Sequence, residues 1–273
     1  LDPHLRPGRS SRLAAPLDAG RMRSGGATAR PVAVVAATEM ELAPLRAFLA
    51  DVRTFALPGA DGAWRGRLAG RPLVLAASGV GTAAAATTAA TLAARVGPAA
   101  LIVTGIAGAY VGAFVPVGAV VAAASEHDLD AGVVARADQA SLASIPLPRG
   151  AGPDGPLFET VATDPGWRSA LARASGTVAL PFATSDAISG DLDVAAARAE
   201  RSGAAIESME GVGAALACAR LGIPFGELRG VSNVAGVRDK DAWDVPAALR
   251  AATRALRIAL AEGPDPDPTG PGT

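Results

Sequence analysis

The sequence predicts a single α/β domain in which helices flank a central sheet, and three observations support this fold class. The chain has 273 residues, 50% of them hydrophobic, which is enough to bury one full-sized core. Continuous apolar runs such as residues 32–37 are typical of strands that are covered on both faces. Alanine-rich segments with helical spacing separate these runs, so helices are expected to cover the sheet.

The two ends of the chain are predicted to lie outside this domain, which we place at residues 31–262. Residues 1–30 are rich in Arg, Gly, Ser and Pro without a regular apolar period, and residues 263–273 are rich in Pro, Asp and Gly. Such segments cannot offset the entropy of ordering, so we expect a disordered leader and a disordered tail. The leader lacks the apolar centre of a secretory signal, although its arginines are compatible with an organelle transit peptide.

Composition excludes several classes of partner. The formal net charge is −1, with acids and bases interspersed, so no nucleic-acid-binding face is expected. No apolar run reaches the roughly 18 to 20 residues that cross a bilayer, and we expect a cytoplasmic protein without membrane contact. Cys218 is the single cysteine and is predicted to be a small core residue. No metal site is expected, because His4 lies in the leader and His127 lacks a second ligand at a suitable spacing.

The first strand, residues 32–37, leads into a helix with Leu42, Leu45 and Leu49 at helical spacing. Thr38 is predicted to cap this helix, with Glu41 as the acidic partner of a capping box. Glu39 and Glu41 also suit the positive end of the helix dipole. A functional role at this strand-to-helix junction is the alternative.

Two glycine-containing segments follow the next strands. Residues 73–77 form a strand that ends at Ser78–Thr82, before a helix to about Arg95. Glycines at such a junction let the backbone approach an anion or a sugar. The dinucleotide fingerprint that residues 79–84 loosely match is discounted, because the expected acidic ribose ligand is absent. The strand at residues 101–103 runs into residues 105–108, which are either a ligand-binding turn or a plain tight turn.

The second half continues the alternation of strands and helices. Residues 137–156 are rich in Pro, Gly and Ser and are predicted to form a long loop, mobile or acting as a lid. The remaining elements are predicted as a strand at 117–124 that leads to Glu126–Asp128, a helix at 167–174, a strand at 177–182, a turn at 184–190, a helix to Arg201, a strand from Pro224 that ends at Ser232 and Asn233, and a helix at 245–260.

The chain is organised around residues 206–211, where a short apolar run turns into an alanine-rich helix that reaches about Leu221. Glu207 and Glu210 lie at this turn. Capping of the helix is one explanation for them. A binding site is the other, because Gly211 and Gly213 leave space beside Glu210 and ligands collect at strand ends of open α/β sheets.

Five motifs in this order resemble the nucleoside phosphorylase/nucleosidase superfamily. They are Glu41, Ser78–Gly81, Gly105–Gly108, Met209–Gly211 and Ser232–Asn233. The resemblance covers about residues 31–262 and is nearest to the branch of methylthioadenosine/S-adenosylhomocysteine nucleosidases and futalosine hydrolases. It implies a nucleoside phosphorylase-like fold with a mixed twisted sheet, a purine nucleoside substrate, a homodimer, and neither a cofactor nor a metal.

The resemblance also implies roles for individual residues. Glu41 corresponds to the carboxylate that deprotonates the attacking water, Glu210 to the group that holds the ribose hydroxyls, and Asn233 to the contact with purine N7. Breaking the C1′–N9 bond creates positive charge on the ribose, so a nearby carboxylate helps most in the transition state. The expected substrate-binding residues are Ser78, Gly79, Ile106, Ala107, Ala187, Ile188, Met209, Ser232 and Arg238.

Asn233 is the informative departure, because the adenine-releasing nucleosidases have an Asp that protonates N7. An amide cannot give up a proton, so the site suits hypoxanthine, and the resemblance implies hydrolysis of futalosine in menaquinone biosynthesis. Arg238 is expected either to meet the acidic 5′ substituent or to pair with Asp239, and Trp243 is expected to be a packing residue. The alternatives are a methylthioadenosine/S-adenosylhomocysteine nucleosidase, a purine nucleoside phosphorylase and a non-catalytic nucleotide-binding module.

Overall fold

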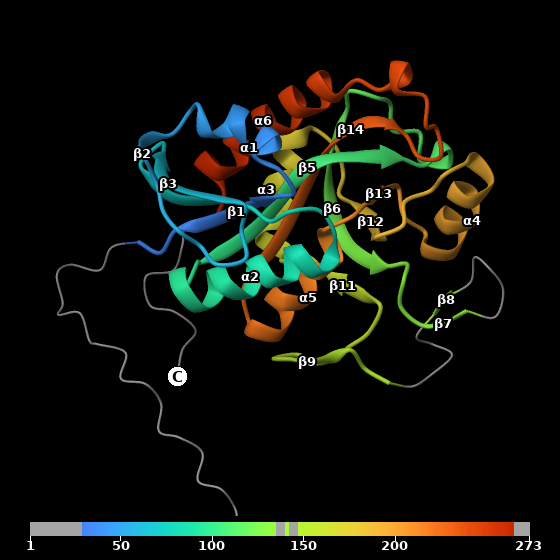
Figure 1. Cartoon of the computed structure of the whole chain (residues 1–273), viewed down its shortest axis with the longest axis horizontal. Coiled ribbons are helices and arrows are strands. Elements are labelled where there is room, and N and C mark those ends of the chain that lie inside the picture. Colours follow the sequence, from blue (N-terminus) through green and yellow to red (C-terminus); the bar gives the residue numbers. More distant parts are fainter. Residues whose placement is uncertain (1–28, 135–139, 142–146, 265–273) are drawn as a thin grey trace, which may run out of the picture.

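A central mixed sheet with helices on its faces forms the body of the molecule (Figure 1), as the sequence predicts. The computed structural model describes residues 29–134, 140–141 and 147–264. The elements are β1 (Val32–Ala36), α1 (Glu39–Arg46), β2 (Ala50–Thr54), β3 (Gly62–Leu68), β4 (Arg71–Ala77), α2 (Thr82–Val96), β5 (Ala100–Ala109), η1 (Val111–Ala113), β6 (Val120–Asp128), β7 (Val133–Val134), β8 (Ala140–Ser141), β9 (Gly150–Gly152), β10 (Gly155–Leu157), β11 (Thr160–Ala162), α3 (Pro165–Ser175), β12 (Leu180–Thr184), α4 (Leu192–Ser202), β13 (Ile206–Ser208), α5 (Gly211–Leu221), β14 (Phe225–Val234), η3 (Lys240–Ala242) and α6 (Val245–Glu262).

The strands of the main sheet run in the order β11-β6-β12-β13-β5-β1-β4-β3-β2. Strand β1 lies between β4 and β5 and is parallel to both. Strand β14 pairs with β5 in parallel and with β6 in antiparallel orientation. Strand β6 also pairs with β12, β12 with β13, and β13 with β5. These four strands and β14 therefore close into a ring. The sheet is therefore open at the β2 end and closed on itself at the other.

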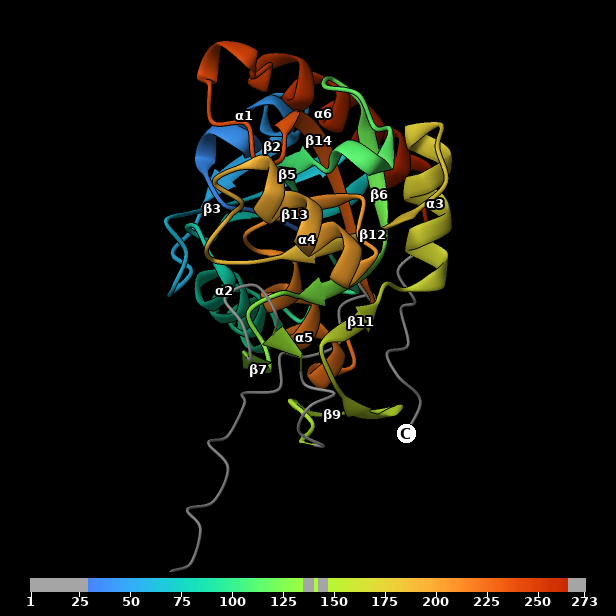
Figure 2. The ribbon, with the colours of Figure 1, turned by 90° about the vertical axis from the view of Figure 1, so that its right-hand side faces the viewer.

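Helices cover the open part of the sheet from two sides. Helices α1, α3 and α6 bury one apolar cluster, which includes Leu45, Leu171 and Leu256. Helices α2 and α5 bury a second cluster on the opposite face, which includes Leu92 and Cys218. Burial raises the pKa of the Cys218 thiol to about 12, so the prediction of a core cysteine is confirmed. Helix α4 packs near β12 and β13 at the closed end, as Figure 2 shows.

Two strands run further than the sequence predicts. Strand β5 does not end at Val103 but continues through residues 105–108, so the prediction of a glycine turn there is wrong. Gly105 has φ +136°, and a Cβ at this residue would lie 3.0 Å from Arg229 Nη1 and collide with the Glu41 carboxylate. The glycine thus serves close side-chain approach to a strand. Strand β14 includes Ser232 and Asn233, where we expected it to end, and continues to Val234.

Other segments differ in smaller ways. Residues 126–128 belong to β6 rather than following it. The predicted loop at 137–156 contains short strands (β8, β9, β10), and its residues 137–139 and 142–146 lie outside the described residues. So do most of the predicted leader and tail, although Arg30 donates hydrogen bonds to the carbonyls of Gly97 and Pro98.

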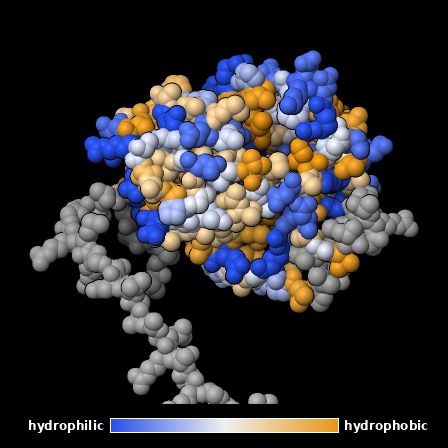
Figure 3. All heavy atoms as spheres, viewed as in Figure 1, coloured by the Kyte–Doolittle hydropathy of each residue, from blue (hydrophilic) through white to orange (hydrophobic). Residues whose placement is uncertain are grey.

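The surface is mixed in character. On the face shown in Figure 3, hydrophilic and hydrophobic residues are interspersed. Among the described residues, no helix combines the length and the apolar character that crossing a bilayer demands.

Candidate active site

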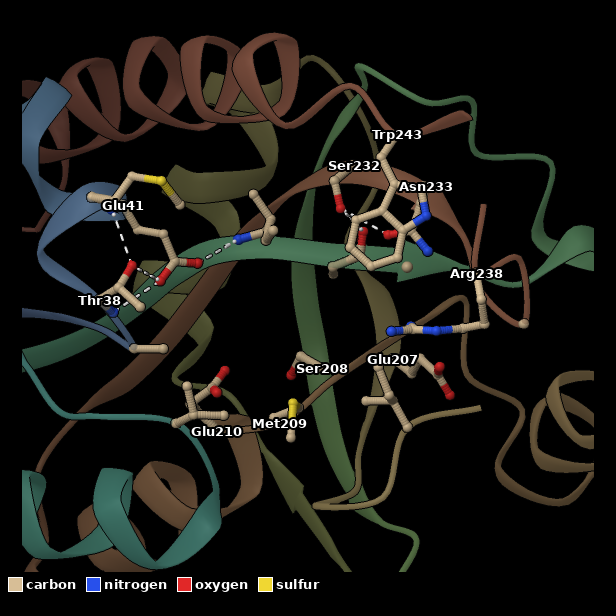
Figure 4. Close-up of a pocket in the computed structure, with 18 residues that line it drawn as sticks. Thr38, Glu41, Glu207, Ser208, Met209, Glu210, Ser232, Asn233, Arg238 and Trp243 are labelled. Atoms are coloured by element: carbon tan, nitrogen blue, oxygen red, sulfur yellow. Dashed lines mark hydrogen bonds between the residues drawn. The ribbon is translucent and has the colours of Figure 1, made fainter. Parts of the chain in front are cut away.

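A cavity of about 240 Å³ lies where β1, β5, β13 and β14 meet. Its lining includes all three residues that the sequence assigns to catalysis, Glu41, Glu210 and Asn233. In Figure 4, Glu41 lies at one end of the cavity and Asn233 at the other, with residues 207–210 running below them. Six of the nine predicted substrate-binding residues also line the cavity: Ile106, Ala107, Ile188, Met209, Ser232 and Arg238.

Ser78, Gly79 and Ala187 do not line this cavity. The Ser78 hydroxyl is turned towards backbone carbonyls of Ala36 and Gly79, and the Gly79 amide bonds to the Ala37 carbonyl. Ala187 exchanges hydrogen bonds with the Ser185 side chain in a tight turn. In each case a neighbour, Val80 or Ile188, faces the cavity instead.

Glu41 is held by a capping box and also faces the cavity. Its Oε2 accepts hydrogen bonds from Thr38 N (3.0 Å) and Thr38 Oγ1 (2.9 Å), and Thr38 Oγ1 accepts from Glu41 N. The second oxygen, Oε1, accepts from Ile106 N at 3.1 Å. The carboxylate is therefore fixed by donors from two elements. The helix-capping explanation is confirmed, and it does not exclude a role in the cavity, because the same side chain also lines the cavity.

Glu210 precedes α5 but does not cap it with its side chain. Its Oε1 accepts from Gly81 N at 3.3 Å, and its Oε2 pairs with Arg229 Nη2 at 3.2 Å. Gly213 allows this arrangement, because a Cβ there would be 2.9 Å from the Thr82 carbonyl carbon. The glycine brings the start of α5 against the start of α2, and Glu210 thereby reaches the N-terminus of α2.

Arg229 is the residue that sequence reasoning missed. It is 1% exposed in β14 and donates to Glu227 Oε1 (2.7 Å), Glu210 Oε2 (3.2 Å) and the Ile106 carbonyl (3.4 Å). Burial alone would lower the pKa of Arg229, but the charges of Glu227, Glu210 and Glu41 raise it above its ordinary value. The only signal in the sequence was a charged pair, Glu227 and Arg229, at alternate positions of an otherwise apolar strand.

Asn233 has a fixed amide. Ser232 Oγ donates to Asn233 Oδ1 at 2.8 Å, and Asn233 Nδ2 donates to the Val234 carbonyl at 2.9 Å. An amide nitrogen carries two N–H groups, so one donor remains for a ligand. The hydroxyl thus sets which end of the amide is available.

Arg238 and Trp243 form one wall of the cavity. The Arg238 guanidinium lies over the Trp243 ring, 5.1 Å from its centroid, and Figure 4 shows it extending into the cavity. Trp243 Nε1 donates to the Val237 carbonyl at 3.1 Å. Trp243 therefore does more than pack, since it lines the cavity and orients the only described cation in the lining.

Glu207 is buried and holds in place the segment that contributes Ile188 to the cavity lining. Its carboxylate accepts from Ser189 N (3.0 Å), Ser189 Oγ (2.6 Å) and Tyr110 Oη (3.1 Å). Burial and the neighbouring Glu207 charge raise the pKa of Tyr110 above its usual range. The phenol therefore stays protonated and keeps donating.

The described part of the chain contains no group of three or more His, Cys, Asp or Glu residues that could hold a metal. His127 lies outside the cavity and bonds through Nδ1 to Thr160 Oγ1.

The chain is similar to known proteins over most of its length. The model of the Phosphorylase superfamily matches residues 31–262. A protein named futalosine hydrolase from Thermus thermophilus is 38% identical over 200 residues, which are 73% of this chain and 86% of the relative. An S-adenosylhomocysteine nucleosidase of Streptococcus pyogenes, solved with 5-methylthiotubericidin, is 26% identical with a TM-score of 0.72 and covers 86% of this chain and 98% of its own.

A futalosine hydrolase structure from Helicobacter pylori shares the fold at 17% identity, with a TM-score of 0.72 over 86% of this chain and 98% of its own. The match to the family model agrees with the observed fold, which the solved nucleosidase shares. The chain therefore belongs to the phosphorylase superfamily, and within it to the N-glycosyl hydrolases that include the futalosine hydrolases.

Proposed function

We propose that this enzyme hydrolyses the N-ribosidic bond of futalosine and releases hypoxanthine, a step of menaquinone biosynthesis in the cytoplasm. The observation that carries the proposal is the presence of Glu41, Glu210 and Asn233 in one cavity, together with the similarity to proteins named futalosine hydrolase.

In this proposal the two carboxylates act at the sugar. Glu41, fixed by Thr38 and Ile106, takes a proton from the attacking water, a role typically worth about 10² to 10⁴ in rate. Glu210 holds the ribose hydroxyls and stabilises the positive charge that develops as the C1′–N9 bond breaks. Met209 packs against the sugar.

Asn233 donates its free N–H to N7 of the leaving base. A neutral hydrogen bond is worth about 0.5 to 1.5 kcal/mol, against about 1.5 to 3 kcal/mol for a charged one. This weaker help suits hypoxanthine, whose 6-oxo group already withdraws electron density. Arg238, exposed beside Trp243, meets the acidic group on the 5′ side of the sugar.

Three hydrogen bonds favour water over phosphate as the nucleophile. The amide and hydroxyl of Thr82 at the start of α2 both donate to the Asp186 carboxylate, at 2.7 and 2.8 Å. The Gly81 amide donates to Glu210. Helix N-termini bind anions through such donors, and here two carboxylates already use them. A phosphorolytic reaction is therefore disfavoured.

A base-release assay tests the proposal. Futalosine, aminodeoxyfutalosine, inosine, methylthioadenosine and S-adenosylhomocysteine are offered side by side, with and without phosphate. We expect hypoxanthine from futalosine at a rate that phosphate does not change. Faster release of adenine from methylthioadenosine would favour the alternative nucleosidase, and dependence on phosphate would favour a phosphorylase.

The variant Asn233→Asp tests the role of the amide. A carboxyl group at this position can protonate N7, so the ratio of kcat/KM for adenine nucleosides to that for futalosine is expected to rise. An unchanged ratio would mean that other residues select the base.

We also propose that the enzyme is a homodimer. Val111 and Phe114 are 68% and 92% exposed next to the ring of strands, and apolar side chains of this size are often covered by a partner. Light scattering that reports a monomer would contradict this.

A further inference from the structure

Two carboxyl oxygens in the core face each other without a donor between them. They are Glu126 Oε1, from β6, and Glu227 Oε2, from β14, and both side chains are fully buried. Gly211 marks their meeting point, because a Cβ there would lie 2.6 Å from Glu227 Oε2 and collide with the Glu126 carboxyl. Neither carboxyl group lines the cavity.

The outer oxygens of this pair are already satisfied. Glu126 Oε2 accepts from the Thr184 hydroxyl, and Thr184 Oγ1 in turn accepts from Val212 N at 3.0 Å. Glu227 Oε1 accepts from Arg229 Nε at 2.7 Å. A carboxylate is an acceptor only, so the two inner oxygens can bond only if one of them carries a proton.

The neighbouring charges decide which carboxyl group holds the proton. Glu227 accepts directly from the Arg229 cation, whereas Glu126 accepts from the neutral Thr184 hydroxyl and lies beside Glu227, and the Arg229 charge acts on it less than burial and Glu227 do. Burial, and then the charge of Glu227, raise the pKa of Glu126 well above its usual range.

We propose that Glu126 is protonated and donates to Glu227, and that this pair is a positioning element for Arg229 and, through Arg229, for Glu210 in the cavity. The role of the pair in turnover rests on the proposed role of Glu210. The proton itself does not depend on any substrate.

The hydrogen bonds form a continuous chain from the core to the cavity. It begins at Glu126, passes through Glu227 to Arg229 Nε, and ends where Arg229 Nη2 meets Glu210 Oε2. With Glu126 neutral, Glu227 presents a single negative charge, and Arg229 is shared between it and Glu210. If Glu126 were ionised, two adjacent buried charges would repel each other and draw Arg229 inward, away from Glu210.

The charged and titratable groups that face the pair come from several elements. Glu227 and Arg229 belong to β14, Glu210 precedes α5, and Glu41 from α1 acts through Arg229. A test of pH dependence must therefore isolate Glu126. The variant Glu126→Gln does so, because its amide N–H replaces the acid proton and does not titrate. Glu200→Gln, on the exposed side of α4, is the matched control.

The first arm measures melting temperature from pH 5 to pH 8. Above about pH 4.3 an unfolded glutamic acid loses its proton, while folded Glu126 keeps it. The folded state then binds more protons than the unfolded state, so wild-type stability falls as pH rises. We expect the melting temperature of Glu126→Gln to increase relative to that of the wild type as the pH rises. The difference between Glu200→Gln and the wild type is expected to stay constant. A pH-independent difference for Glu126→Gln would overturn the proton assignment.

The second arm measures kcat and KM with whichever nucleoside the wild type hydrolyses, so that a wrong substrate assignment does not mask the result. We expect Glu126→Ala to lower kcat at least tenfold with KM within threefold, and Glu126→Gln to restore most of that loss. The alkaline fall of kcat caused by ionisation of Glu126 is expected to disappear in Glu126→Gln. Equal loss of kcat in both variants, or no loss in either, would overturn the positioning role. The melting experiment does not use Glu126→Ala and therefore tests the proton on Glu126 even if that variant does not fold.

Discussion

Strands β1 and β14 lie on either side of β5 in the same sheet, yet they bury opposite kinds of side chain. All five residues of β1 are apolar and buried. Strand β14 is as deeply buried, but it carries Glu227, Arg229, Ser232 and Asn233. The first strand contributes apolar contacts to the core, whereas the second places Ser232 and Asn233 in the cavity lining and buries Glu227 and Arg229 outside it. Position in a sheet therefore does not reveal which strand carries the chemistry.

The difference has an energetic cause. An apolar strand gains free energy from burial against any well-packed neighbour. A buried charge costs several kcal/mol unless specific partners are in place. The partners of β14 come from distant parts of the chain, namely Ile106 on β5, Glu210 before α5 and Glu126 on β6. The buried charges of β14 are thus compensated only when these partners are in place.

The largest expected effect comes from removing a charge in the cavity. Glu41→Gln and Glu210→Gln are each expected to lower kcat at least about a hundredfold, because they remove the proposed base and the charge proposed to stabilise the transition state. Both variants are expected to stay folded. Steady-state kinetics and circular dichroism check this. Turnover near that of the wild type would remove the residue from the mechanism.

A change in β1 is expected to lower stability and leave kcat unchanged. Val34 is fully buried between Leu75 and Ile102, so Val34→Ala should cost about 2 kcal/mol of unfolding free energy through lost burial and a cavity. Because Val34 does not line the active-site cavity, kcat is expected to match that of the wild type. Urea denaturation and the base-release assay measure the two quantities. A large loss of kcat at retained stability would erase the contrast between β1 and β14.

The smallest effect is expected at Ser232. Ser232→Ala removes the hydroxyl that fixes the Asn233 amide, while the carbonyl of Val234 still holds Nδ2. Loss of one neutral hydrogen bond, about 0.5 to 1.5 kcal/mol, corresponds to a decrease in kcat/KM of up to about tenfold. Asn233→Ala is the comparison variant. An equal loss in both would mean that Ser232 acts on the substrate directly.

Local chemistry accounts for what the sequence could predict. The apolar run at residues 32–37, the capping box of Thr38 and Glu41, and the α5 helix after Glu210 depend on neighbours in sequence, and the structure contains all of them. The resemblance of five motifs to a known superfamily predicted that Glu41, Glu210 and Asn233 belong to one site, and all three line the same cavity.

The features that the sequence did not predict depend on contacts between residues far apart in the chain. Gly105 looked like a turn residue because only the folded protein shows that Glu41 and Arg229 approach it. The partner of the α2 N-terminus, Asp186, lies 104 residues from Thr82. The carboxyl groups of Glu126 and Glu227 also meet, although their strands, β6 and β14, are far apart in sequence. No local period or propensity encodes such pairs.

The ring of strands and strand β2 at the sheet edge are also expected to differ in their tolerance to insertions and chain breaks. Every residue of β2 is exposed, and this strand pairs only with β3 at the open end of the sheet. A tag or a reporter domain inserted at Asp51 and Val52, where the pairing of β2 with β3 is irregular, is therefore expected to leave nucleoside cleavage intact. A circular permutation that opens the chain between α5 and β14 would instead separate Glu210 from Arg229 along the chain. These two residues form the ion pair between the core and the cavity, so such a permutation is expected to lower activity.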